Sequence, residues 1–126
     1  MRADIQIVIN EIEKSLSLLR QRLDWDNVKK KREEFDALTE DPDLWNEPDK
    51  AQKLMRERQN FIDQVDGHDT ISNELKDNIE LIELAEIEAD EEILQEAVAA
   101  LQKLKKRASS KELEALLNSE ADGNDT

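Results

Sequence analysis

The chain has 126 residues, of which 40% are charged and 3% aromatic, and its formal net charge is −14. Strands favour β-branched and aromatic residues, so this composition excludes a sheet protein and favours long helices with a narrow apolar seam. An acidic chain repels phosphate backbones, so we expect weak or no nucleic-acid binding by the chain alone. Protein surfaces with basic patches are the expected partners.

The sequence contains no cysteine, which excludes disulfides and thiolate chemistry and suits a reducing cytoplasm. It has no apolar run of the length that a membrane-spanning helix needs. Its first residues also lack the apolar core of a secretory signal peptide. We therefore expect a cytoplasmic protein with no membrane contact.

The first predicted helix covers about residues 3–23, where isoleucine and leucine recur at intervals of four and three. Its apolar stripe consists of Ile5, Ile9, Ile12, Leu16, Leu19 and Leu23. Asp24 follows the stripe and either caps a second helix that runs to about Thr39 or marks only a bend.

Residues 40–48 interrupt the helical pattern and contain both prolines of the chain. Proline disfavours α conformation in the residue before it, so one helix should end near Glu40 and the next should begin near Glu47. We expect Asn46 to be the N-cap, with proline in the first turn, and the tryptophan to plug the end of a helical bundle. The residues that we assign to this structural motif are Asp41, Pro42, Leu44, Trp45, Asn46 and Pro48.

The third predicted helix is about 40 residues long, or about 60 Å. Its seam comprises Leu54, Phe61, Val65, His68, Leu75, Ile79 and Ile82. Gly67 lies within the seam and weakens a helix by about 1 kcal/mol relative to alanine. A kink or a soft point is therefore expected at residues 65–69.

The fourth predicted helix starts after Asp90, a suitable N-cap, and its apolar positions are Ile93, Leu94, Ala97, Leu101, Leu104 and Ala108. Ser109 and Glu112 have capping-box spacing, so a new short helix starts there or the fourth helix continues through. Residues 1–118 would form the bundle domain. Residues 119–126 would form a flexible acidic tail that leads toward a catalytic domain outside this chain.

These elements predict an all-α fold, an elongated antiparallel bundle of three to four helices with coiled-coil-like packing. The first two helices would act together as one bent arm. Short connections make neighbouring helices antiparallel, and the core would be only one seam deep.

No pattern in the sequence resembles an active site. His68, the only histidine, has no nucleophile or second metal ligand nearby and reads as a structural residue. A glycine-rich phosphate loop, a metal-binding cluster and a nucleophile elbow are all missing from the sequence. A carboxylate di-metal bundle needs Glu-x-x-His pairs, which are also missing. We expect no enzyme activity, no cofactor and no metal.

Charged clusters offer two further readings. Nine acids and no base lie from Asp77 to Gln102, which places a negative tip at the turn between the last two helices. The tip is either solvated surface or a docking site for a basic protein, with Glu88, Asp90, Glu91 and Glu92 as candidate contacts. The basic clusters at 29–32 and 103–107 either touch RNA phosphates or pair with glutamates at helical spacing, such as Glu33 and Glu34.

Five blocks of the sequence resemble the N-terminal helical domain of the bacterial class 1 peptide chain release factors. They are Leu16–Arg20, Glu40–Asn46, Ala51–Arg58, Leu81–Ala85 and Glu112–Leu117. The Asp-Pro-Asp-Leu-Trp-Asn segment within the second block is the most specific, and the likeness is greatest to the branch that reads UGA and UAA. Residues 65–69 depart from the family pattern.

This resemblance implies a part of a translation termination factor on the ribosome. The family reads stop codons with a Ser-Pro-Phe loop and triggers peptidyl-tRNA hydrolysis with a Gly-Gly-Gln loop, and neither motif occurs here. The resemblance therefore assigns these residues to docking and positioning near the ribosomal stalk base and the GTPase release factor. The alternative is a free-standing helical adaptor or coiled-coil protein, which would not need the Asp41–Asn46 block.

Overall fold

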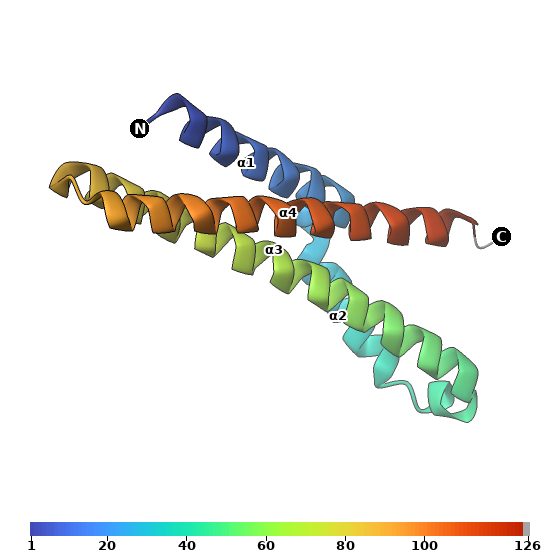
Figure 1. Ribbon diagram of the computed structural model, residues 1–126. Coiled ribbons are helices and arrows are strands. Elements are labelled where there is room, and N and C mark those ends of the chain that lie inside the picture. The colour runs from blue at the N-terminus through green and yellow to red at the C-terminus, as the bar shows by residue number, and fades with distance from the viewer. Residues whose placement is uncertain (125–126) are drawn as a thin grey trace.

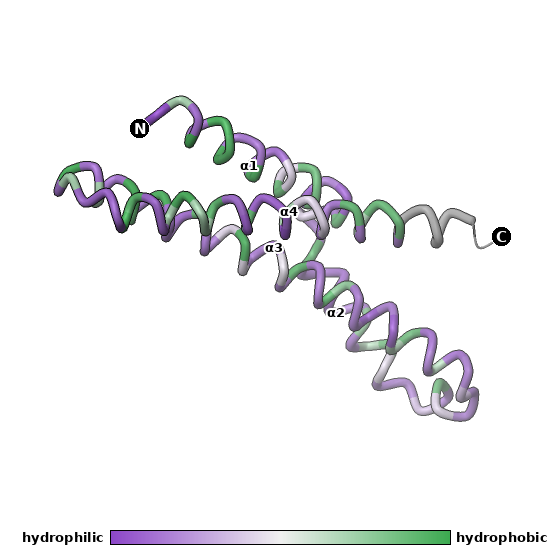
Figure 2. The backbone as a smooth tube through the Cα atoms, in the orientation of Figure 1, coloured by the Kyte–Doolittle hydropathy of each residue, from purple (hydrophilic) through white to green (hydrophobic). Residues whose placement is uncertain are grey.

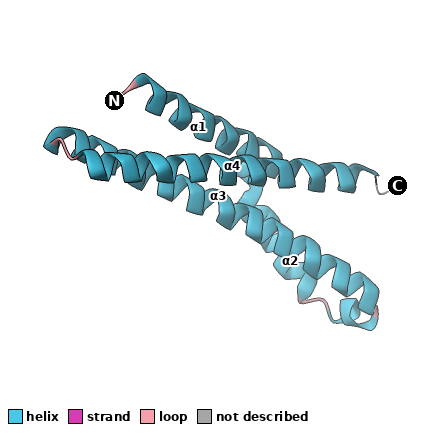
Figure 3. Ribbon diagram, viewed as in Figure 1, coloured by secondary structure: helices cyan, strands magenta, loops and turns pink. Residues whose placement is uncertain are grey.

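The computed structural model describes the backbone of residues 1–124 and the side chains of residues 1–118. Four α-helices account for most of it: α1 (Ala3–Leu23), α2 (Val28–Thr39), α3 (Pro48–Glu88) and α4 (Glu91–Asn124). Short 3-10 helices cover Trp25–Asn27 and Pro42–Asn46. Residues 1–124 contain no strand (Figure 3), which confirms the predicted all-α class.

Three helices form the bundle (Figure 1). α3 and α4 make a long antiparallel hairpin, and α1 packs against both, running in the same direction as α4. The start of α1 lies beside the end of α3, where the Met1 amino group is 3.4 Å from the Glu86 carboxylate. α2 packs against the first half of α3, and this second hairpin projects away from the bundle.

The core follows the predicted stripes. All six predicted positions of α1 are buried, and so are Leu94, Ala97, Leu101, Leu104 and Ala108 of α4. Hydrophobic stretches recur along the bundle helices in Figure 2, whereas the α2–α3 hairpin is mostly hydrophilic. A second, smaller core cluster joins the two regions, with Leu19, Leu23, Phe61 and Ala115 at its centre. The thin core that the sequence predicts therefore consists of two clusters in series.

Gly67 of α3 lies beside Lys111 of α4. The helix continues through residues 65–69 without a break. A Cβ atom on this glycine would lie 2.8 Å from Cε of Lys111, closer than real Cβ contacts allow. The Cε atom belongs to the end of a flexible side chain, so the lysine can move aside and the glycine is not required for packing.

Asp24 ends α1 instead of capping α2. It adopts a left-handed conformation with φ of 54°, and its N–H bonds to the carbonyls of Arg20 and Gln21. Its carboxylate accepts a 2.9 Å hydrogen bond from the Asn27 side chain. The second of the two predicted alternatives, a bend, is confirmed, because one turn of 3-10 helix separates Asp24 from Val28.

The turn between α3 and α4 and the course of α4 also match the predictions. The Asp90 carboxylate accepts a 3.1 Å hydrogen bond from the Ile93 N–H, so Asp90 is the N-cap. Ala89 takes the left-handed conformation, with φ of 55°. α4 runs through Ser109 without interruption and ends at Asn124, so residues 119–124 of the predicted tail continue its backbone. Residues 125–126 lie outside the described residues, and the flexibility of 119–126 stays a prediction.

Candidate docking surfaces

The Asp41–Pro48 segment connects α2 to α3. Asp41 accepts a 3.0 Å hydrogen bond from the N–H of Asp43 and so starts the 3-10 helix. The predicted helix limits are confirmed, since α2 ends at Thr39 and α3 starts at Pro48. The predicted N-cap is wrong: Glu47 is the N-cap, because Pro48 is itself the first helical residue and Asn46 closes the 3-10 helix.

Trp45 does not plug the bundle, and that prediction is wrong. Its side chain is 56% exposed. Its indole Nε1 donates a 3.2 Å hydrogen bond to the Thr39 carbonyl, which ties the 3-10 helix back to the end of α2. The ring stays exposed because the projecting hairpin is only two helices thick, so no third helix covers it.

His68 is 5% exposed and joins α1 to α3. Its Nε2 is 3.0 Å from the Arg20 guanidinium, and its Nδ1 is 3.1 Å from the Asp69 carboxylate. A guanidinium only donates and a carboxylate accepts, so Nδ1 carries the proton and Nε2 accepts. The ring also packs against Trp25 at 4.2 Å between centroids. Both nitrogens thus have partners within the protein, as a structural histidine requires.

The four acids of the predicted docking site lie together at the turn between α3 and α4. Glu88, Glu91 and Glu92 are exposed, and none of them forms an ion pair with any residue in the described part of the chain. Asp90 differs, because it is half-buried and its carboxylate caps α4. Three of the four predicted contacts therefore present uncompensated negative charge to solvent.

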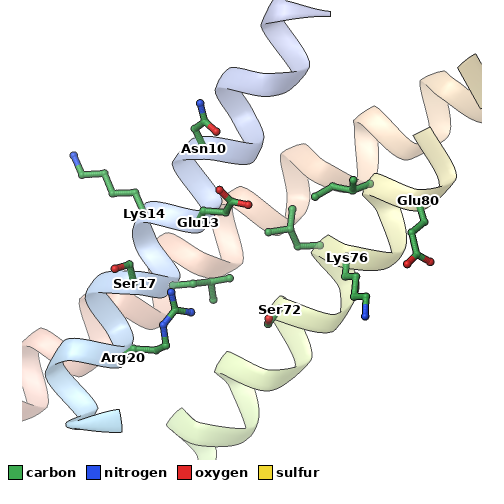
Figure 4. A pocket seen from close by; sticks show the side chains of 11 residues that line it. Asn10, Glu13, Lys14, Ser17, Arg20, Ser72, Lys76 and Glu80 are labelled. Carbon is green, nitrogen blue, oxygen red and sulfur yellow. The ribbon is translucent and has the colours of Figure 1, made fainter. Parts of the chain in front are cut away.

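A groove between α1 and α3 was not predicted from the sequence. Its volume is about 840 Å³, its floor includes Leu16, Leu75 and Ile79, and charged side chains such as Glu13 and Lys76 line its edges (Figure 4). The groove forms because α1 and α3 both pack mainly on α4 and touch each other less. Polar residues recur at positions 10, 13, 17 and 20 of α1, and all four line the groove. This polar series could have indicated the groove in the sequence.

The basic clusters make contacts between helices, not within them. Lys105 pairs with Glu11 of α1 at 2.7 Å, and Arg107 pairs with Glu74 of α3. Lys31 lies over the Phe61 ring, 5.0 Å from its centroid. The expected partners Glu33 and Glu34 form no ion pair with these clusters among the described side chains. Part of each cluster therefore joins two helices, in the bundle for residues 103–107 and in the α2–α3 hairpin for Lys31.

The described residues offer neither a metal site nor a membrane span. No set of three or more potential ligands is arranged to hold a metal ion. None of the helices in that part of the chain is both long and apolar enough to cross a membrane.

Comparison with known proteins identifies the family. The PCRF domain matches residues 28–126, which begin at the first residue of α2 and include all of α3. The chain belongs to the peptide chain release factor family. Residues 1–27, which include α1 and the 3-10 helix Trp25–Asn27, lie outside the match.

Two of the following three relatives match over α1 as well. Peptide chain release factor 2 of Roseobacter denitrificans is 56% identical over 100% of this chain and 34% of its own length. The protein of the same name from a Ruegeria species is 50% identical over 99% of this chain and 33% of its own length. That of Caulobacter vibrioides is 50% identical over 81% of this chain and 28% of its own length. The chain thus spans about a third of the length of these release factors.

Proposed function

We propose that this protein acts in translation termination, as the helical docking domain of a cytoplasmic release factor that reads UGA and UAA. Membership of the release factor family supports the process. The identity to proteins named release factor 2 supports the choice of stop codons. In this proposal the parent protein triggers hydrolysis of peptidyl-tRNA through parts outside these residues.

The docking role rests on the geometry of the acidic tip. Glu88, Glu91 and Glu92 are exposed without cationic partners, and they lie at the end of the bundle where α3 turns into α4 (Figure 1). α4 then runs 34 residues, or about 50 Å, away from the tip. Such a rod can place one charged end against a distant surface. We assign the tip to contacts near the ribosomal stalk base and with the GTPase release factor.

Neutralising the tip tests this role. We expect the variant Glu88→Gln, Glu91→Gln, Glu92→Gln to bind bacterial ribosomes with an association rate about tenfold lower at low salt, and with weaker salt dependence. Asp90 is left unchanged because it caps α4. The matched control neutralises three exposed acids elsewhere, Asp26→Asn, Glu33→Gln, Glu34→Gln. Equal association rates for wild type and tip variant would remove the tip from the docking surface.

A release assay tests how the parent's activity is divided. The 126 residues contain neither a Ser-Pro-Phe nor a Gly-Gly-Gln motif. We therefore expect the chain to release no peptide from ribosomes stalled at UGA, while a full-length release factor does so in a parallel reaction. Release by the chain alone, dependent on the stop codon, would refute the assignment of docking only.

A further inference from the structure

The end of α3 carries a row of exposed aliphatic side chains. Leu81, Leu84 and Ile87 are 38%, 48% and 82% exposed, the last being the most exposed large apolar side chain described. At about 100° of rotation per residue, the three fall within a sector of about 120°. They lie on the side of the helix away from Ile82, which is fully buried. We call Leu81, Leu84 and Ile87 the apolar ridge.

Acidic side chains share the sector of the ridge. The same rotation places Asp77, Glu80 and Glu88 within it, and all three are exposed. None of the three has an ion-pair partner among the described residues. The surface from residue 77 to 88 therefore extends about 17 Å along the helix and alternates apolar and negative groups.

This pattern has no explanation in the fold. The ridge belongs to neither core cluster, and more than a third of each of its side chains is exposed. Exposed aliphatic side chains in a row are a mark of interaction sites. Burial of such side chains supplies affinity, while the surrounding charges select and steer the partner.

From this surface we propose that the apolar ridge docks a protein surface that presents an apolar groove rimmed by lysine and arginine. The inference rests on the docking role proposed above and adds the contact that supplies its affinity. Charge complementarity selects the partner, because every charged residue from 77 to 88 of α3 is an acid and the chain carries a net charge of −14. Nucleic acid and anionic lipid would be repelled. A second copy of this chain would also be repelled, because it would place its own acids against those beside the ridge.

The position of the ridge also leaves it accessible to another protein. It lies at the tip of the bundle, where α3 ends. The 34 residues of α4 give that helix a length of about 50 Å, so the far end of α4 is about that distance away. A partner can approach there without contact with the α2–α3 hairpin, which projects from the opposite end of the bundle (Figure 1).

Ribosome binding by the variant Leu84→Ala, Ile87→Ala is the test. Alanine keeps helix propensity, and both side chains are outside the core, so the variant should fold as wild type does. The matched control is Leu113→Ala, Leu117→Ala, which removes two aliphatic side chains of α4 that are 54% and 55% exposed. Labelled chains are titrated with ribosomes of Roseobacter denitrificans, and circular dichroism checks the fold of each variant.

We expect the ridge variant to bind at least about tenfold more weakly and the control to stay within about twofold of wild type. If the ridge variant binds like wild type while the tip variant binds more slowly, the docking role stands and the ridge inference is overturned. If both variants bind like wild type, both proposals are overturned.

Wild-type chain that fails to bind ribosomes would refute the docking role, and the ridge is then tested with a defined probe. The probe is a synthetic amphipathic helix of about 14 leucine and lysine residues, and the control peptide has glutamate in place of lysine. Chemical-shift changes confined to residues 77–91 with the lysine peptide alone support the inference, and their absence overturns it.

Sedimentation of the chain alone should give a monomer. A dimer that the ridge variant abolishes would make a second copy the occupant and overturn the assignment.

Discussion

Replacement of His68 by phenylalanine tests whether the polar contact between α1 and α3 stabilises the bundle. The change keeps a ring against Trp25 but removes the acceptor that faces the Arg20 guanidinium at 3.0 Å. A hydrogen bond to a charged group contributes about 1.5–3 kcal/mol. The bond to Asp69 contributes little, because that carboxylate is 57% exposed. Phenylalanine offsets part of the loss through its more apolar ring, so we expect a net cost of about 1–2 kcal/mol.

The variant His68→Ala separates the two contributions. It removes the hydrogen bond and also the ring that packs on Trp25 at 4.2 Å between centroids. An aromatic pair adds about 0.5–1.5 kcal/mol, and the cavity adds a further cost. We therefore expect alanine to destabilise the protein by about 3 kcal/mol, clearly more than phenylalanine does.

Urea denaturation followed by circular dichroism measures both free energies of unfolding. A double-mutant cycle with Arg20→Met isolates the pair, and we expect a coupling energy of about 1–2 kcal/mol. A coupling energy below about 0.3 kcal/mol would show that the guanidinium and the imidazole meet without stabilising the bundle. The structural reading of His68 would then rest on its ring alone.

Four further substitutions test the fold by the same denaturation assay. Ile82→Ala empties a fully buried site and should cost about 3 kcal/mol or more, so a cost below about 1 kcal/mol would contradict its place in the core. Trp45→Ala should cost only about 1 kcal/mol, because the ring is 56% exposed and makes one hydrogen bond; a loss near 3 kcal/mol would mean that it is buried. Ala89→Gly should stabilise by about 0.5 kcal/mol, since glycine adopts φ of 55° without the steric cost of a Cβ, and no gain would argue against the left-handed turn. Gly67→Ala should also stabilise by about 0.5 kcal/mol, because only the flexible end of Lys111 has to move; a loss would show that this contact is rigid.

The helices themselves follow from local sequence. Apolar spacing places one face of α1 in the core, and all six predicted positions, from Ile5 to Leu23, are buried. Proline chemistry sets the end of α2 and the start of α3, and Asp90 caps α4 through a bond to a residue three positions away. These features depend on neighbours within a turn or two of helix, which the sequence shows directly.

The sequence also located the acidic tip but not its most exposed apolar neighbours. A run of acids can be read from the sequence however the helices pack, so the negative charge at Glu88, Glu91 and Glu92 could be predicted. Leu84 and Ile87 lie outside the seam predicted for the third helix, but no pattern in the sequence assigned them to the surface. Their exposure depends on which face of α3 meets α1 and α4, and that choice is made only when the helices pack.

The sequence alone therefore determined the helices, their stripes and the net charge, because each of these arises from contacts along one helix. Only the tertiary structure decided which polar side chains became internal and which apolar ones stayed outside. His68 acquired a partner from α1, Gly67 came to lie beside a lysine of α4, and Trp45 remained exposed on a two-helix arm. Each of these outcomes depends on the relative position of helices far apart in the chain, which periodicity within one helix does not encode.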